Sequence, residues 1–186
     1  MSQFDWMKNP ENNKILIILR GLPSCGKSFR AKELSGGDKS IVCSADDFFG
    51  ITNEEYVANW CIEKLGTAHN ECRKKAKILM QRQVPLVIID NTNTVFREIL
   101  PYFDMAVQYQ YRVQIEEPTS PWWLEQIAPF LTDKVKNKKH LEKMCQFLVL
   151  KNQETHQVPL VSMLKMMFRY QPNITFDDLV RVYEKA

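Results

Sequence analysis

A short apolar run that leads directly into a glycine-containing loop constrains this chain more than any other feature of its sequence. Residues 14–20 read KILIILR, without the alternation of a half-exposed strand, which predicts a strand buried on both faces of a parallel sheet. Residues 21–28 read GLPSCGKS and match the P-loop pattern G-x-x-x-x-G-K-[ST]. The residues that follow, 27–34, are compatible with a helix. This context indicates a phosphate-binding loop rather than a glycine turn that resembles one by accident.

Each fixed position of the motif has a chemical task. Gly21 and Gly26 let the backbone turn tightly, so that successive N–H groups point at phosphate oxygens. Lys27 places a positive charge on the β- and γ-phosphates, and the hydroxyl of Ser28 is a ligand for Mg²⁺. We therefore expect ATP or GTP to bind here together with Mg²⁺. The expected nucleotide site consists of Gly21, Leu22, Pro23, Ser24, Cys25, Gly26, Lys27, Ser28 and Phe29.

Length and composition are those of one ordinary globular domain. The 186 residues are 45% hydrophobic and 25% charged, and the net charge of +3 is too small to imply nucleic acid by itself. We expect residues 1–13 to be a flexible leader and residues 14–186 to be a single domain. No apolar stretch approaches the length of a membrane span, and the N-terminus lacks the layout of a secretory signal. These patterns predict an intracellular protein, cytoplasmic or nuclear, without a membrane partner.

The cysteines support the same location. There are five of them, an odd number, and they form no C-x-x-C, so neither a disulfide framework nor a zinc site is predicted. Cys25 lies inside the P-loop, and we expect its alkylation to interfere with nucleotide binding.

Two further strands lead into acidic residues. A short strand is expected at residues 40–43 and precedes Asp46 and Asp47, whereas the buried-type strand at residues 86–90 ends in Asp90. Ligands bind at the carboxyl ends of parallel strands, so these acids should lie beside the P-loop. Asp90 resembles a Walker B acid, which holds Mg²⁺ directly or through water. Asp46 or Asp47 is a candidate general base, and a pair of helix-capping acids is the alternative.

The rest of the chain alternates helices with strands and then becomes helical. Strand, helix, strand, helix in this order argues for an α/β fold of the P-loop kinase type, with a mainly parallel sheet flanked by helices and a helical C-terminal portion, lid included, at about residues 121–186. The expected elements are helices at 54–83 and 95–108, the latter with a break near Pro101, a less buried strand at 109–116, and helices at 122–130, 132–150, 160–170 and 176–185, the last capped by Thr175.

Several other residues have two interpretations from the sequence alone. Trp122 and Trp123 are suited either to stacking on bases or to holding a helix on the core. His69 lies on the apolar stripe of its helix, which favours a hydrogen-bonded core histidine. The lysines at 134, 136, 138, 139 and 143 could track a phosphate backbone, although such a run is more often a solvated helix face. The polar segment at residues 151–159 is a candidate lid over the phosphates.

Five short motifs, in a fixed order, resemble a known family. They read LRGLP at residues 19–23, SADDFF at 44–49, AHN at 68–70, IIDNTN at 88–93 and YQYRV at 109–113, followed by Glu117, Pro118 and Trp122. The series resembles the polynucleotide-kinase-like P-loop domain of the Nedd-binding protein family. It is also similar to the N-terminal P-loop domain of the myelin cyclic-nucleotide phosphodiesterase, notably at residues 103–111. The resemblance covers about residues 14–170.

The resemblance implies a kinase that moves the γ-phosphate of ATP to a 5′-hydroxyl of RNA or DNA. It implies an acid at the first position of the Asp46–Asp47 pair as general base, because the phosphodiesterase-like domain keeps an acid only there. The implied catalytic residues are Lys27, Asp46, Asp90 and Lys151, with Ser28 and Asp90 on the metal. The implied acceptor side is formed by Asp46, Asp47, Asn91, Thr92 and Asn93.

Three departures from the family pattern bear on activity. Asn91 replaces an Asp of phage-type kinases, although the Nedd-binding group shares the Asn. Lys151 replaces a lid arginine and lacks its bidentate fork, which predicts weak turnover. Phe49 stands where an acceptor-binding arginine is expected.

Two rival functions remain open on this sequence. One is a nucleotide-binding interaction module whose chemistry has decayed, and the other is a P-loop kinase with a small-molecule acceptor. Cyclic phosphodiesterase activity is not expected, because it needs paired H-x-[ST] motifs. None of His69, His140 and His156 is followed by Ser or Thr two places on.

Overall fold

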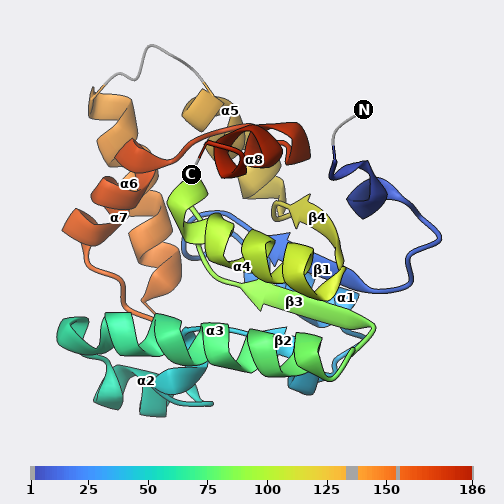
Figure 1. Ribbon diagram of the computed structural model, residues 1–186. Helices are drawn as coiled ribbons and strands as arrows, with labels where there is room; N and C mark the ends of the chain where they lie inside the picture. Colours follow the sequence, from blue (N-terminus) through green and yellow to red (C-terminus); the bar gives the residue numbers. More distant parts are fainter. Residues whose placement is uncertain (1–2, 133–137, 154–155, 186) are drawn as a thin grey trace.

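The computed structural model describes residues 3–132, 138–153 and 156–185. Within these ranges the chain builds a parallel four-stranded sheet with helices on both faces, as Figure 1 shows. The strands are β1 Ile15–Leu19, β2 Val42–Cys43, β3 Leu86–Asp90 and β4 Arg112–Glu116, in the order β2-β3-β1-β4. The helices are α1 Lys27–Leu34, α2 Asn53–Asn59, α3 Leu65–Gln81, α4 Phe96–Tyr109, α5 Ala128–Thr132, α6 Lys138–Asn152, α7 Leu160–Arg169 and α8 Phe176–Tyr183. The expected α/β class is confirmed.

Alternate residues of β1 serve the two faces of the sheet. Leu16 and Ile18 pack into the larger core, which α3, α4 and α8 cover, whereas Ile17 and Leu19 pack with Ala31 of α1. These four of the five side chains of β1 are at most 4% exposed because β1 is a central strand with a parallel neighbour on each side. The burial on both faces that the apolar run predicted for this strand is therefore confirmed.

The helix expected at residues 54–83 is two helices. α2 ends at Asn59, Trp60 and Cys61 adopt extended backbone conformations, and α3 begins at Leu65 after the 3-10 turn η4, Ile62–Lys64. The apolar spacing that suggested one helix begins only at Leu65, so it carried no information about the residues before it. The break directs α2 across the end of α3.

The helix break expected near Pro101 is absent. α4 runs without interruption from Phe96 to Tyr109, with Pro101 inside it. A proline in this position removes one backbone hydrogen bond. Ile99 and Phe103, on either side of it, are fully buried, and their packing keeps the helix in place.

The N-terminal residues do not lie apart from the domain as a leader would. Phe4 and Met7, around the 3-10 turn η1 (Asp5–Lys8), are 6% and 0% exposed in the larger core. Nearby, the ammonium of Lys8 lies 2.5 Å from a carboxylate oxygen of Asp177 on α8. The part of residues 1–13 that the structure describes therefore belongs to the folded unit.

The helical C-terminal portion packs on the P-loop. The π-helical turn η5 (Trp123–Ile127) and helices α5–α7 form a second core that also contains the P-loop side chains Leu22 and Cys25. The helix expected at 132–150 is described from Lys138 as α6, and residues 133–137 lie outside the described residues. Thr175 caps α8 as expected, in a reciprocal capping box with Asp178. In the ranges that the structure describes, no helix is both long and apolar enough to cross a membrane.

Candidate functional site

The candidate site is a cavity of about 840 Å³ at the carboxyl ends of the strands. Lys27 and Ser28 follow β1, Asp90 ends β3 and Asp46 follows β2, and all four line this cavity. Because β3 lies between β1 and β2, the P-loop, Asp90 and Asp46 follow one another along one edge of the sheet. The structure thus brings together the residues that the sequence predicted at three strand ends.

The P-loop has the backbone that its glycines predict. Gly21 and Gly26 have φ values of 147° and 89°, which side-chain-bearing residues rarely adopt, and Gly26 is the N-cap of α1. Lys27 is 9% exposed, and its ammonium donates a hydrogen bond of 2.9 Å to the carbonyl of Leu22. The lysine ammonium therefore already lies at the loop where the phosphates of a nucleotide would bind.

Asp90 is a buried acid beside this lysine. It is 7% exposed, and burial raises the pKa of its carboxyl, while the charge of Lys27 and the hydroxyl of Ser28 act in the opposite direction. Serine and carboxylate oxygens are the donors that Mg²⁺ accepts. Among the described residues no group of three or more His, Cys, Asp and Glu could hold a metal alone. The donor set fits Mg²⁺ shared between one or two protein oxygens and the phosphates of a nucleotide.

The two adjacent acids after β2 point to different surroundings. Asp46 lines the cavity, is hydrogen-bonded to Tyr56, and has Oδ2 at 3.8 Å from Nδ1 of His156. Asp47 is outside the cavity lining, and its Oδ2 lies 3.7 Å from the ammonium of Lys75. The geometry therefore supports Asp46, and not Asp47, as the acid that faces a substrate.

The three residues after Asp90 also divide between cavity and scaffold. Asn91 and Thr92 line the cavity, and Asn91 accepts the N–H of Ala45 and donates to the hydroxyl of Tyr102. Asn93 is 2% exposed, lies outside the cavity lining, and donates to the last carbonyl of β1 over 2.6 Å. Its side chain ties strand ends together, so the structure does not place Asn93 on an acceptor.

The two tryptophans lie in different surroundings, and only the packing role is confirmed, for Trp123. Trp123 is fully buried in the second core. Trp122 lines the cavity and donates from its indole N–H to the carbonyl of Ser24 in the P-loop over 3.0 Å. The ammonium of Lys151, another cavity residue, lies 4.0 Å from the centre of the Trp122 ring. Asn152 then donates to the hydroxyl of Ser24 over 2.8 Å, so the end of α6 is attached to the P-loop.

The expected lid and lysine run are only partly described. His156 reaches the cavity, whereas residues 154 and 155 of the expected lid lie outside the described residues, as do the lysines at 134 and 136. Phe49, at the position of the expected acceptor-binding arginine, is 1% exposed in the larger core. It therefore belongs to the fold and faces no substrate.

Cys25 is a poor target for alkylation, contrary to the expectation from its place in the motif. The thiol is fully buried in the second core, and burial raises its pKa to about 12. Leu22 is fully buried in the same core, and neither residue lines the cavity. At both positions the side chain packs in the second core, so only the backbone is left to contact a nucleotide.

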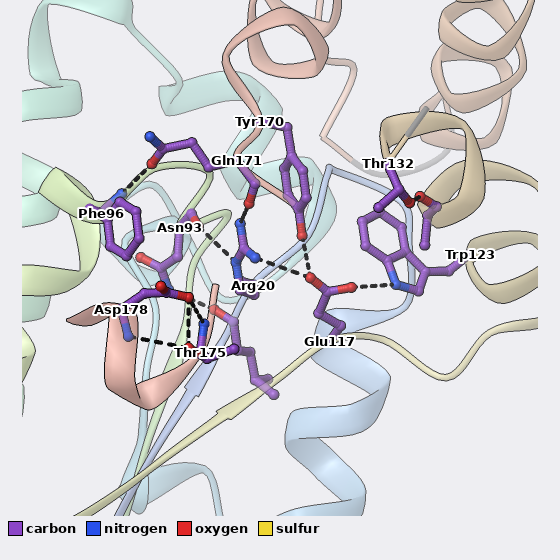
Figure 2. Close-up of polar contacts among 12 residues, drawn as sticks. Arg20, Asn93, Phe96, Glu117, Trp123, Thr132, Tyr170, Gln171, Thr175 and Asp178 are labelled. Atoms are coloured by element: carbon purple, nitrogen blue, oxygen red, sulfur yellow. Dashed lines mark hydrogen bonds and ion pairs between the residues drawn. The ribbon is translucent and has the colours of Figure 1, made fainter. Parts of the chain in front are cut away.

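A buried arginine, to which the sequence pattern gave no role, lies at the start of the P-loop. Arg20 is 1% exposed, with burial lowering the pKa of its guanidinium and Tyr170 and Glu117 opposing that shift. Figure 2 shows its contacts: Nη1 lies 3.2 Å from a Glu117 oxygen, Nη2 donates to the carbonyl of Gln171, and Nε donates to that of Asn93. The Tyr170 ring stacks on the guanidinium at 4.5 Å and its hydroxyl donates to Glu117 over 2.7 Å. The sequence feature that could have indicated this buried ion pair is a charged residue, Arg20, directly after the apolar strand β1.

A second missed group lies beyond Asp46. This part of the cavity is lined by two aromatic residues, Tyr56 on α2 and Trp60 just after it. Two cations of α7, Lys165 and Arg169, also line it. His69 lines it too, half-buried, and burial is the main cause of its lowered pKa. The expectation of a core histidine was therefore wrong, because His69 faces the cavity.

The chain is similar to known proteins over its first two thirds. Residues 16–126 match the model of a family described as AAA domain. NEDD4-binding protein 2 of Homo sapiens is 37% identical over 110 residues, which are 59% of this chain and 6% of that protein. The 2′,3′-cyclic-nucleotide 3′-phosphodiesterases of Pongo abelii and Mus musculus are 33% and 30% identical over 119 and 114 residues, 60% of this chain in each case and 25% and 26% of theirs. The resemblance that the motifs suggested is confirmed, and the chain matches only a small part of the length of these relatives.

Proposed function

The chain belongs to the AAA domain family that its residues 16–126 match, and from this premise we propose that it is an ATP-dependent 5′-hydroxyl polynucleotide kinase. The P-loop of such a domain binds a nucleoside triphosphate, here ATP or GTP. The observation that carries the proposal is the single cavity that joins Lys27 and Ser28 to Asp90 and Asp46 and then continues past Asp46. A phosphate donor and an acceptor hydroxyl can therefore meet in one cavity.

The donor phosphates have a defined place in this proposal. Backbone N–H groups of the P-loop and the N-terminal end of α1 receive the β-phosphate, and Lys27 leaves the carbonyl of Leu22 to contact the β- and γ-phosphates. Ser28 and Asp90 would hold Mg²⁺, which when bound neutralises charge on the β- and γ-phosphate oxygens.

The acceptor is activated by Asp46. Its carboxylate accepts the proton of a 5′-hydroxyl while the oxygen of that hydroxyl bonds to the γ-phosphorus. The bond between this phosphorus and the oxygen that bridges to the β-phosphate breaks, and ADP leaves. Tyr56, which is hydrogen-bonded to Asp46, keeps the carboxylate turned toward the cavity.

Lys151 is the proposed lid cation. In the structure its ammonium rests on the ring of Trp122, beside the P-loop carbonyl that Trp122 holds. From there a rotation of the side chain carries the charge to the transferring phosphate. As a point charge it stabilises that phosphate less than an arginine fork would, so the proposal includes a modest turnover.

The test is transfer of labelled γ-phosphate from ATP to 5′-hydroxyl RNA and DNA oligonucleotides, with a nucleoside and a sugar as parallel acceptors. We expect labelled oligonucleotide with the wild type, none with Lys27→Ala, and wild-type labelling with Lys32→Ala, a control on the exposed side of the same helix. Labelling of the small acceptors in preference to oligonucleotides would replace the polynucleotide acceptor with a small molecule. Binding of Mg·ATP without label in any acceptor would reject the kinase.

A further inference from the structure

Beyond Asp46 the cavity continues into a recess that the phosphate chemistry does not use, and we name it the acceptor pocket. Its residues are Tyr56, Trp60, Leu65, His69, Lys165 and Arg169. We propose that the acceptor pocket binds the first nucleotide of the acceptor strand, stacking its base on an aromatic wall and holding the next phosphate with the cations of α7. The inference rests on the proposed function, because it specifies what binds at the acceptor end of the same site.

The strand order places this pocket on the acceptor side. β2 is an edge strand, and α2 and the start of α3 follow it, so their side chains lie past Asp46 and away from the P-loop. Trp122 and Lys151 follow β4, the opposite edge strand, and lie against Ser24 of the P-loop. The residues that follow β2 therefore form most of the acceptor end of the cavity, to which α7 adds two cations, whereas Trp122 and Lys151 lie at the P-loop end.

The aromatic wall of the pocket, Tyr56 and Trp60, lies beside Asp46, the proposed general base. Tyr56 is hydrogen-bonded to Asp46, and the centre of its ring lies 4.3 Å from that of His156. Tyr56 is 5% exposed and packed against Phe49 at 5.6 Å, so it is a fixed part of the wall. Trp60 is half-buried and faces the cavity from the extended end of α2. An unpaired base that stacks on Trp60 brings its own 5′ carbon close to Asp46.

A second part of the pocket lining is cationic and comes from α7. Lys165 and Arg169 are one helical turn apart on α7, so their side chains share one face and both line the cavity. Arg169 lies 3.0 Å from Glu98 and is partly neutralised by it. Lys165 is exposed and makes no hydrogen bond or ion pair with another described residue. Its charge is therefore available to a ligand.

Aromatic side chains together with such cations are the ordinary means of binding a single nucleic-acid strand. Bases stack on the rings whatever their identity, and lysine or arginine contacts the phosphates. A nucleoside or sugar uses at most part of this pocket, whereas a strand uses both its aromatic and its cationic parts. The pocket therefore favours a nucleotide that is unpaired and continues into a phosphate, without preference for one base.

The experiment measures binding rather than transfer. A 5′-hydroxyl hexanucleotide carries a fluorophore at its 3′ end, and a second hexanucleotide is identical but lacks the base of its first nucleotide. Fluorescence anisotropy without ATP gives the dissociation constant of each. We expect the abasic strand to bind the wild type roughly 5- to 150-fold more weakly, the span that loss of one stacked base produces.

Variants assign this difference to the pocket. Trp60→Leu should lose the discrimination between the two strands, and Trp60→Phe should keep most of it. Lys165→Met should weaken both strands alike and lower the slope of log affinity against log salt by about one. The matched controls are Trp6→Leu on η1 and Lys77→Met on α3, both exposed and outside the cavity, which should behave as the wild type.

The outcomes separate the inference from the function on which it rests. Equal affinity of the wild type for the two strands, or no binding of either, overturns the acceptor pocket even where phosphate transfer is observed. Discrimination that survives in Trp60→Leu overturns it as well. Discrimination that depends on Trp60 supports the pocket, and it does so even where no transfer is detected and the kinase proposal falls.

Discussion

Nδ1 of His156 lies 3.8 Å from Oδ2 of Asp46. The two residues are far apart in sequence, one following β2 and the other following α6, and Tyr56 contacts both. His156 therefore lines the cavity beside the carboxylate that the proposed mechanism assigns to the acceptor hydroxyl. This relationship makes Asp46 the first residue to test.

Replacing Asp46 by Asn should abolish most phosphate transfer while ATP still binds. The amide keeps the size of the side chain and cannot accept the hydroxyl proton, so we expect the rate to fall by roughly 10²- to 10⁴-fold. Single-turnover transfer to an oligonucleotide and nucleotide binding by calorimetry measure the two quantities.

Asp47→Asn is the matched control, since the adjacent acid lies outside the cavity lining. It should keep a rate within a few-fold of the wild type. A wild-type rate for Asp46→Asn, or equal losses in the two variants, would remove Asp46 from the mechanism.

Replacing Asp90 by Asn should stabilise the protein without nucleotide and disable its response to Mg·ATP. Burial raises the pKa of Asp90 above its ordinary value of 3.8, so the folded state binds this proton more tightly than the unfolded state. The stability of the wild type therefore falls as the pH rises from 3.8 through the folded pKa, and the loss is complete above it. The variant lacks this loss.

Urea unfolding at pH 7 and near pH 3.8 measures the difference. We expect Asp90→Asn to be more stable than the wild type at pH 7 and equal to it near pH 3.8. Mg·ATP at about 100 times its dissociation constant should stabilise the wild type by about 2.7 kcal/mol and the variant by much less. A variant that is less stable at pH 7 would contradict the sign of the pKa shift.

Replacing Arg20 by Ala should lower the free energy of unfolding by about 3 kcal/mol. This is the lower end for removing one partner of a buried ion pair, because the side chain of Glu117 is 33% exposed and keeps some contact with water. Two carbonyl groups also lose their donor.

Arg30→Ala provides the comparison, since Arg30 pairs with Glu116 at 2.8 Å but is itself 27% exposed. We expect a loss of about 1 kcal/mol or less from this more solvated pair. Chemical denaturation of both variants measures the contrast, and similar losses would show that burial of Arg20 is not what matters.

Replacing Lys151 should change turnover more than nucleotide affinity. Lys151→Met removes the charge proposed to contact the transferring phosphate, and we expect kcat to fall roughly tenfold or more. Lys151→Arg supplies the bidentate fork and should raise kcat above that of the wild type. Lys143→Met, an exposed lysine on the same helix that does not line the cavity, is the control. Equal kcat values in all variants would confine Lys151 to its contact with Trp122.

The features that the sequence predicted correctly are local. The strand before the P-loop, the loop itself and the strand that ends in Asp90 each follow from consecutive residues, because burial on both faces and phosphate binding impose a residue type at nearly every position. The parallel sheet then follows from the alternation of strands and helices, and it places Asp46 beside Asp90 without further information.

The features that it missed depend on distant partners. Arg20 is paired with a carbonyl 151 residues away, at Gln171, and no local spacing encodes that contact. Trp60 faces the cavity because the backbone extends there, which helical periodicity in the following residues concealed. Asn93 looked like a substrate ligand from its motif, whereas its amide bonds the end of β1.

The buried guanidinium of Arg20 also joins the part of the chain that matches the family to residues that follow α7. Similarity to the AAA domain family ends at residue 126, yet the guanidinium at the end of β1 also donates to the carbonyl of Gln171 and stacks with Tyr170, and both residues follow α7. A fragment cut at the limit of similarity would keep Asn93 and Glu117 but would remove the Gln171 carbonyl and the Tyr170 ring from Arg20. It would also uncover Leu22 and Cys25. The part of the chain that matches the family is therefore shorter than the part that packs as one unit. The P-loop depends on the longer part, because the helices that cover its side chains lie mostly beyond residue 126.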